Sequence, residues 1–230
     1  MDRVRFLSKV VLAACLSFAL AFTLSCSSDD GNSGGNCGCE VASPSSSSSV
    51  GEQGSSSSED RGCSIQSYKT VEIGTQTWMA ENLNCVGEDA VNPVGACYNS
   101  APLNCNIYGR LYDWSTAKWI CPTGWHLPTD AEWDILVNYA GGSEVAGTKL
   151  KAKSGWNNNG NGTDNYGFSA LPGGISCGSI SYSGAWWSTT EHEQYTSTAY
   201  IKRMDSANGS VATSSTNTTR GLSVRCLKDQ

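Results

Sequence analysis

Histidine is almost missing from this sequence, because His126 and His192 are the only two histidines among 230 residues. Zinc sites of the finger type need four cysteine or histidine ligands at short, fixed spacings, and no two Cys-x-x-Cys motifs supply them. No arrangement of Ser, His and Asp typical of nucleophilic catalysis stands out. These shortages argue against zinc binding, and they make an enzyme the least favoured functional hypothesis.

Positive charge is also scarce. The chain has 15 lysines and arginines against 21 aspartates and glutamates, which gives a net charge of −6. Proteins that bind nucleic acids need a basic surface that neutralises phosphates. The sequence therefore predicts no nucleic-acid partner.

Long hydrophobic runs occur only at the N-terminus, where residues 1–25 have the layout of a signal peptide. Arg3, Arg5 and Lys9 precede an uncharged stretch over residues 10–24. As a helix this stretch is about 22 Å long, too short for a bilayer core of roughly 30 Å. An export signal is therefore favoured over a permanent membrane span.

Cys26 is the predicted lipidation site, because a small residue before a cysteine at the end of the signal suits a lipoprotein signal peptidase. Cys15 has a better local match, but only about five apolar residues separate it from Lys9, and a signal needs about 7–15. Ordinary cleavage near Ser25, with free secretion, is the alternative. We expect an exported chain that is anchored by lipid to a membrane, at the outer membrane or the cell surface.

Residues 26–62 are dominated by Ser, Gly, Asn and acidic residues. This composition buries too little apolar surface to fold, which predicts a disordered tether with a reach of about 30–35 Å. Cys37 and Cys39 lie within it. Crosslinking is favoured for them over a redox or metal role, because such a role needs a structured, electropositive site.

Eleven cysteines in an exported chain indicate disulfide bonds. Without Cys15 and Cys26 an odd number, nine, is left. At least one of these is therefore free, pairs with another chain or has a different role.

All eight tryptophans lie from Trp78 onward, so residues 63–230 are predicted to form one domain. A hairpin is expected over residues 69–79 and a first helix over residues 111–120. Thr129 and Glu132 form a capping box that predicts a second helix. The face expected to be buried carries Trp133, Leu136, Val137 and Ala140. The helix is expected to end at Gly141-Gly142.

Short strands are expected in the last quarter of the chain, over residues 186–188, 198–204, 210–213 and 222–227. Asn208-Gly209 suits a two-residue hairpin turn. Helices followed by antiparallel strands predict an α+β fold.

Six segments, in this order, resemble motifs of the Fibrobacter succinogenes major paralogous domain family. They are IGTQTWMAENL at residues 73–83, YGRLY at 108–112, CPTGWHLPTDAEW at 121–133, YGFSALPGG at 166–174, WWSTTE at 186–191 and SVRC at 223–226. They are distributed over most of the range from residue 68 to residue 229.

That family is similar to the C-type-lectin-like superfamily, which implies a lectin-like domain with two helices and short antiparallel strands. The resemblance also implies a disulfide between Cys121 and Cys226, since such domains join a cysteine near a helix to one in the last strand. Cys97 and Cys105 are a second, local candidate pair. The formylglycine-generating enzymes resemble residues 127–133, but their paired active-site cysteines have no counterpart near Cys226.

Calcium-dependent sugar binding in lectin-like domains uses carboxylate and amide oxygens. Asp164 and Glu191 are the candidate calcium ligands, and Asn165 lies beside the first of them. The Glu-Pro-Asn and Trp-Asn-Asp signatures of sugar-binding lectins are missing. A solvated Asn/Gly loop without an ion is therefore favoured, and no other cofactor is expected.

Exposed aromatic rings stack on sugars. The aromatic candidates are Trp156, Tyr182, Trp186, Trp187 and Tyr195, and the polar candidates beside them are Asp164, Asn165 and Glu191. Trp186 and Trp187 point to opposite faces if their segment is a strand, so one is buried and the other is a candidate for exposure. For each single tryptophan, core packing is the favoured interpretation.

The favoured function is binding or adhesion outside the cytoplasm by a membrane-anchored domain, with polysaccharide as the ligand. The alternative is a structural or protein-interaction lipoprotein that binds an envelope protein and has no small-molecule site. An enzyme comes third, and His126 is interpreted as a structural group rather than a catalytic base.

Overall fold

The computed structural model describes residues 63, 68–87, 93–176, 178 and 180–230. Contacts divide the chain into two units, Met1–Asn36 and Cys37–Gln230, and all described residues belong to the second unit. Outside the described residues lie the predicted signal peptide and tether, with Cys26, Cys37 and Cys39, and also Cys177. None of the helices in the described ranges is both long enough and apolar enough to span a bilayer.

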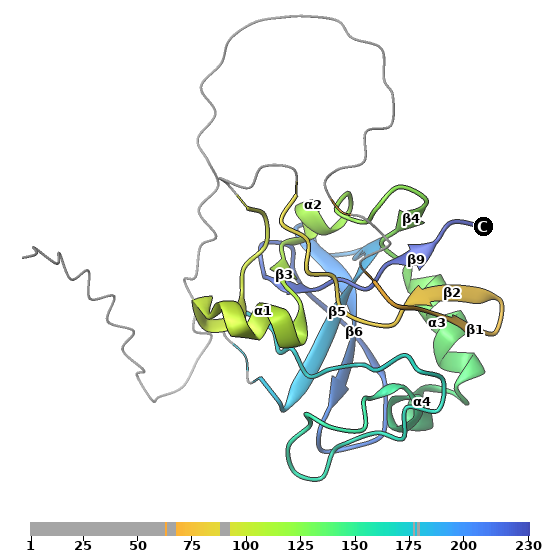
Figure 1. Cartoon of the computed structure of the whole chain (residues 1–230). Coiled ribbons are helices and arrows are strands. Elements are labelled where there is room, and N and C mark those ends of the chain that lie inside the picture. The colour runs from red at the N-terminus through yellow and green to blue at the C-terminus, as the bar shows by residue number, and fades with distance from the viewer. Residues whose placement is uncertain (1–62, 64–67, 88–92, 177, 179) are drawn as a thin grey trace, which may run out of the picture. The chain divides into compact units, whose positions relative to one another are not determined.

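Two sheets form the framework (Figure 1). The first has the strand order β1-β2-β9-β4 and is antiparallel, with β1 at Thr70–Ile73, β2 at Gln76–Met79, β9 at Leu227–Lys228 and β4 at Trp125–His126. The second has the order β3-β8-β5-β6-β7, with β3 at Leu111–Tyr112, β8 at Leu222–Ser223, β5 at Ser183–Glu191, β6 at Thr198–Asp205 and β7 at Ala212–Asn217. In the second sheet β5 and β8 run parallel, and the other pairs are antiparallel.

The described residues contain four α-helices beside these sheets, where two were expected. They are α1 (Pro102–Tyr108), α2 (Trp114–Ala117), α3 (Asp130–Tyr139) and α4 (Ser143–Leu150), and a short 3-10 turn, η2, covers Tyr98–Ser100. The fold is therefore α+β, as predicted. The helices α1 and α4 were not predicted.

The helix expected over residues 111–120 is only partly correct. Leu111 and Tyr112 form strand β3 against β8, and α2 begins after Asp113. The Asp113 carboxylate accepts a hydrogen bond from the Thr116 amide at 3.0 Å, which fixes the start of the helix at this point.

The capping box of α3 is confirmed. Thr129 Oγ1 accepts from the Glu132 amide at 3.2 Å, and Glu132 Oε2 accepts from the Thr129 amide at 2.7 Å. Trp133, Leu136 and Ala140 are fully buried along one face of the helix. The first hairpin is also confirmed, with Val71 opposite Trp78.

The two-residue turn at Asn208-Gly209 is wrong, because six residues, 206–211, connect β6 to β7. Asn208 Oδ1 instead accepts from the Ser210 amide at 3.1 Å, and the Gly209 carbonyl accepts from the Thr148 amide of α4 at 3.0 Å. A Cβ on Gly147 of α4 would lie 2.4 Å from the Ser210 carbonyl oxygen. The longer connection thus packs directly on the backbone of α4.

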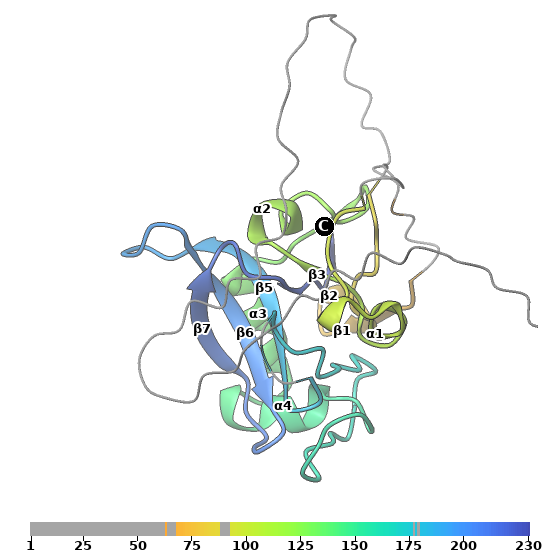
Figure 2. The same ribbon diagram turned by 90° about the vertical axis from the view of Figure 1, so that its left-hand side faces the viewer.

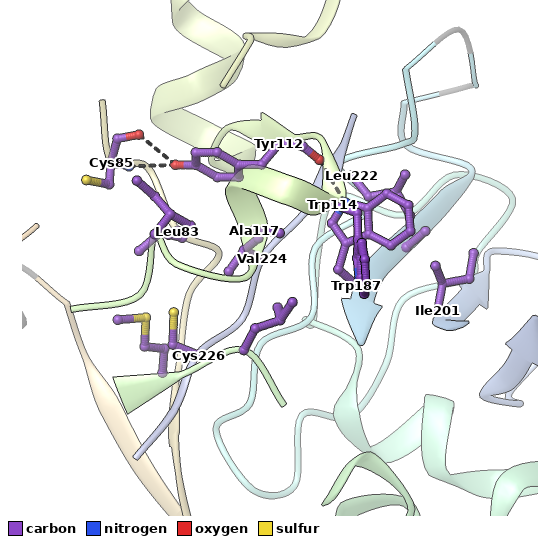
Figure 3. Close-up of a cluster of buried hydrophobic side chains, with 14 of the residues drawn as sticks. Leu83, Cys85, Tyr112, Trp114, Ala117, Trp187, Ile201, Leu222, Val224 and Cys226 are labelled. Atoms are coloured by element: carbon purple, nitrogen blue, oxygen red, sulfur yellow. Dashed lines mark hydrogen bonds between the residues drawn. The ribbon is translucent and has the colours of Figure 1, made fainter. Parts of the chain in front are cut away.

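The central strand β5 separates two clusters of buried side chains. Trp186 packs with Trp133 and Phe168 on the side of α3, and Trp187 belongs to the cluster on the other face. Figure 3 shows this second cluster around Tyr112 and Trp187. The Tyr112 hydroxyl donates to the Cys85 carbonyl and accepts from its amide, both at 2.8 Å, and burial raises the pKa of this hydroxyl.

Three disulfide bonds close the described part of the chain. The pairs Cys121–Cys226 and Cys97–Cys105 are confirmed, with Cα–Cα distances of 5.9 and 5.0 Å. A third pair, Cys63–Cys85, has a Cα–Cα distance of 5.7 Å and was not predicted. The sequence separation is 22 residues for Cys63–Cys85, 8 for Cys97–Cys105 and 105 for Cys121–Cys226.

Arg225 is fully buried and holds together segments that lie far apart in the chain. Its guanidinium donates to Asn82 Oδ1 at 2.7 Å and to the carbonyls of Met79 and Phe168, and it lies 4.4 Å from the centre of the Phe168 ring. Burial lowers its pKa to about 9, against the attraction of the Glu81 and Asp164 carboxylates. The group therefore stays charged at neutral pH.

Candidate functional site

A pocket of about 320 Å³ lies at the connection between β5 and β6. The connection projects beyond the second sheet (Figure 2). The pocket is lined by residues 191–198, by Trp114 at the start of α2 and by Thr218 just after β7. Three separate parts of the chain therefore build it.

The connection is held in shape by its own hydrogen bonds. The His192 amide donates to the Thr198 carbonyl at 3.0 Å, and Thr198 Oγ1 donates to the Tyr195 carbonyl at 2.8 Å. The Gln194 amide donates to His192 Nδ1 at 3.2 Å. In a neutral imidazole the hydrogen then sits on Nε2.

Aromatic rings gather around His192. Its ring centre lies 4.8 Å from that of Tyr195 and 5.0 Å from that of Tyr200, which comes from β6. The Tyr195 side chain is 61% exposed. The Tyr195 ring is thus positioned by its contact with the His192 ring, and it remains accessible to a ligand.

Polar groups complete the pocket. Glu191 and Glu193 are exposed, and the hydroxyl residues Thr196, Ser197 and Thr218 also belong to its lining. No lysine or arginine is among the lining residues. An aromatic face with nearby hydrogen-bonding groups is the combination that small-ligand sites use to bind and orient sugars.

Trp114 connects the pocket to the core. It is 7% exposed, and its indole N–H donates to the Ser188 carbonyl of β5 at 2.7 Å. The Lys118 ammonium lies 3.9 Å from the centre of its ring. The position of this side of the pocket is therefore set by β5 and α2 together.

Trp156 and Trp187, two of the candidates for stacking on a ligand, lie in the core. Their burial confirms the favoured core packing and removes them as ligand contacts. Trp187 is fully buried and its indole donates to the Tyr112 carbonyl at 2.7 Å, while Trp156 is 4% exposed and donates to the Ala170 carbonyl at 3.0 Å. Trp186 is also fully buried and donates to Asn82. Trp186 and Trp187 do point to opposite faces of β5, but both faces are covered.

The other predicted residues fall into two places. Glu191 lines the pocket, whereas Asp164 and Asn165 lie in the loop that packs on α4, where the Asn165 amide donates to the Lys149 carbonyl. Both Asp164 carboxylate oxygens accept hydrogen bonds from Ser169, at 2.8 and 2.6 Å. Within the described ranges, no three His, Cys, Asp or Glu residues are grouped so that they can hold a metal ion.

His126 links three elements. Its Nδ1 lies 2.6 Å from the Asp229 carboxylate that follows β9, and its Nε2 lies 3.1 Å from Glu132 of the α3 capping box. These contacts join β4, α3 and the end of the chain. The geometry agrees with a structural role for this side chain.

Sequence reasoning missed most of the residues that build this pocket. His192 and Tyr200 were not singled out as ligand-binding residues, although a polar run with an aromatic residue between two expected strands was visible at residues 191–195. Trp114 was expected on a helix, but nothing in its local sequence places it beside the β5–β6 connection.

The fold and the pocket define a disulfide-linked α+β domain with a surface site on a strand connection. A family model, the Fibrobacter succinogenes major domain, matches residues 71–228. The chain therefore belongs to this family. No curated protein and no solved structure matches it.

Proposed function

We propose that this chain is an exported, lipid-anchored binding protein whose domain attaches to polysaccharide through the β5–β6 pocket. The observation that carries the proposal is the pocket, in which exposed Tyr195 stands among hydroxyl, amide and carboxylate residues on an internally hydrogen-bonded connection. Such a site offers a stacking face and orienting polar groups without any rearrangement of the backbone.

We also propose that the domain is a variant of the C-type-lectin-like fold. The pairing of β2 with β9, close to the two ends of the domain, supports this assignment. The disulfide between Cys121 and Cys226, which joins the region after α2 to the last strands, supports it as well. The variant has its candidate site at the β5–β6 connection, and calcium at Asp164 and Glu191 is not part of the proposal.

Anchorage and export rest on the sequence alone. Cys26 at the end of the signal and the Ser/Gly-rich residues 26–62 support a lipid anchor followed by a tether with a reach of about 30–35 Å. This arrangement presents the pocket to the exterior of the outer membrane or the cell surface.

The direct test is retention of the full-length protein on a panel of insoluble polysaccharides and on a glycan array. On any glycan that retains the native protein, Tyr195→Ala is expected to weaken binding about tenfold, a typical loss for a central aromatic contact. Tyr182→Ala is the matched control, because Tyr182 is 46% exposed and precedes β5, at the opposite end of that strand from the pocket. No retention on any glycan would refute the proposal, as would equal losses for the two variants.

A protein-interaction role is the second candidate, and exposed apolar side chains on α1 favour it. Leu103 is 74% exposed and Ile107 is 57% exposed, and one helical turn separates them. In the experiment above, this candidate is favoured if no glycan retains the protein while Leu103→Ser reduces capture of an envelope protein.

A further inference from the structure

The charge of the β5–β6 pocket is one-sided. Glu191 and Glu193 are exposed, and the lining contains no lysine or arginine. Lys118, which follows α2, has its ammonium over the Trp114 ring, and neither Lys118 nor Arg220 is part of the lining. A ligand in the pocket therefore meets two carboxylates without a matching cation in the lining.

The exposed aromatic ring adds to this preference. The face of a tyrosine ring attracts cations through its quadrupole, and Tyr195 is 61% exposed as a residue while its ring contacts that of His192. Carboxylates also form charge-assisted hydrogen bonds with ammonium donors, which are shorter and stronger than those with hydroxyl groups. An acidic sugar would instead meet repulsion from both glutamates.

We infer that the pocket selects amine-bearing sugar units, such as those of a glucosamine polymer, over neutral and acidic sugars. This inference rests on the proposed polysaccharide binding. The ammonium group contacts Glu191 and Glu193, and the apolar face of the sugar ring packs on Tyr195. Neutral sugars of the same linkage keep the packing of the sugar ring on Tyr195, but they cannot form the ion pairs with Glu191 and Glu193.

The test is titration calorimetry of the full-length protein at about pH 5.5, where the sugar amines, which are much less basic than a lysine amine, are mostly charged. Three tetrasaccharides with the same β-1,4 backbone are compared, built from glucosamine, N-acetylglucosamine and glucose. The glucosamine tetramer is expected to bind about five- to tenfold more tightly than the other two, in line with two exposed ion pairs. High salt is expected to remove this advantage.

Glu191→Gln combined with Glu193→Gln is expected to lower the affinity for the glucosamine tetramer to that of the neutral tetramers and to leave theirs unchanged. The control, Glu72→Gln with Glu144→Gln, removes two exposed carboxylates outside the pocket and is expected to change nothing. Equal binding of the three tetramers, or an undiminished preference in the pocket variant, overturns the inference and leaves polysaccharide binding standing. Failure to bind any glycan on the panel overturns both.

Discussion

Arg225 is the single residue whose loss we expect to cost most, because its guanidinium satisfies oxygens that have been removed from water. In Arg225→Met the Asn82 side chain and the carbonyls of Met79 and Phe168 lose a donor inside the core. We predict a loss of about 3 kcal/mol in the free energy of unfolding, measured by urea titration. Arg225→Lys keeps the charge without the planar fork and is expected to lose about half as much.

A cost below about 1 kcal/mol for Arg225→Met would contradict this role, because the buried acceptors would then have found other donors or water. The prediction concerns stability alone. Polysaccharide retention by the folded fraction of either variant is expected to equal that of the native protein, since Arg225 is not in the pocket lining.

The sequence favoured core packing for each single tryptophan, but it also left one of Trp186 and Trp187 as a candidate for exposure. A strand pattern placed Trp186 and Trp187 on opposite faces correctly, but it did not reveal that β5 is a central strand with both faces covered. Each indole N–H also has a buried acceptor, from Asn82 or Tyr112, far away in the sequence. Exposure is a property of the assembled domain, and the pattern of neighbouring residues does not contain it.

Among the elements, α3 offers a test of electrostatics at a helix start. Burial alone would raise the pKa of the Glu132 carboxyl, but hydrogen bonds from Thr129 and His126 outweigh it and lower that pKa. A carboxyl with a lowered folded pKa stabilises the native state above its unfolded value of 4.5 and loses this contribution as pH falls through the lowered value.

Glu132→Gln keeps a side chain that can accept from the Thr129 amide but removes the charge. We expect it to lower the free energy of unfolding by about 0.5–1 kcal/mol at pH 7. The difference from the native protein should shrink as pH falls from 4.5 through the lowered folded pKa, where the native carboxyl takes up a proton and loses its charge. Urea titrations at neutral and acid pH measure this, with Glu72→Gln as the exposed control, and a gap that does not change with pH would contradict the interpretation.

Elements with a complete local signal were predicted, and elements defined by distant contacts were not. The capping box and apolar spacing of α3 are contained in about a dozen residues, as are the turn and alternation of the β1–β2 hairpin. Helix α4 depends on Gly147 fitting against the Ser210 backbone, and the two-residue strand β3 depends on its partner β8. Gly147 and Ser210 are more than 60 residues apart in the sequence, so no local pattern predicts their contact. Strand β3 is too short to have a periodic pattern of its own.

For the whole molecule, disulfides and strand pairing tie the two ends of the domain together. Cys63–Cys85 and Cys121–Cys226 fix segments at the beginning, middle and end, and β9 lies between β2 and β4. The β5–β6 connection lies outside these links, and the loop that holds Asp164 is not part of the pocket lining. A ligand can therefore occupy the pocket while the crosslinked framework stays unchanged.

Hydrogen–deuterium exchange of the full-length protein, with and without an oligosaccharide from the best-retained polysaccharide, tests most directly whether this pocket is the binding site. We predict slower exchange on binding at residues 191–198 and near Thr218, with no change in the loop at residues 156–170. Protection confined to residues 156–170, or binding without protection at residues 191–198, would contradict the assignment of the pocket as the polysaccharide site.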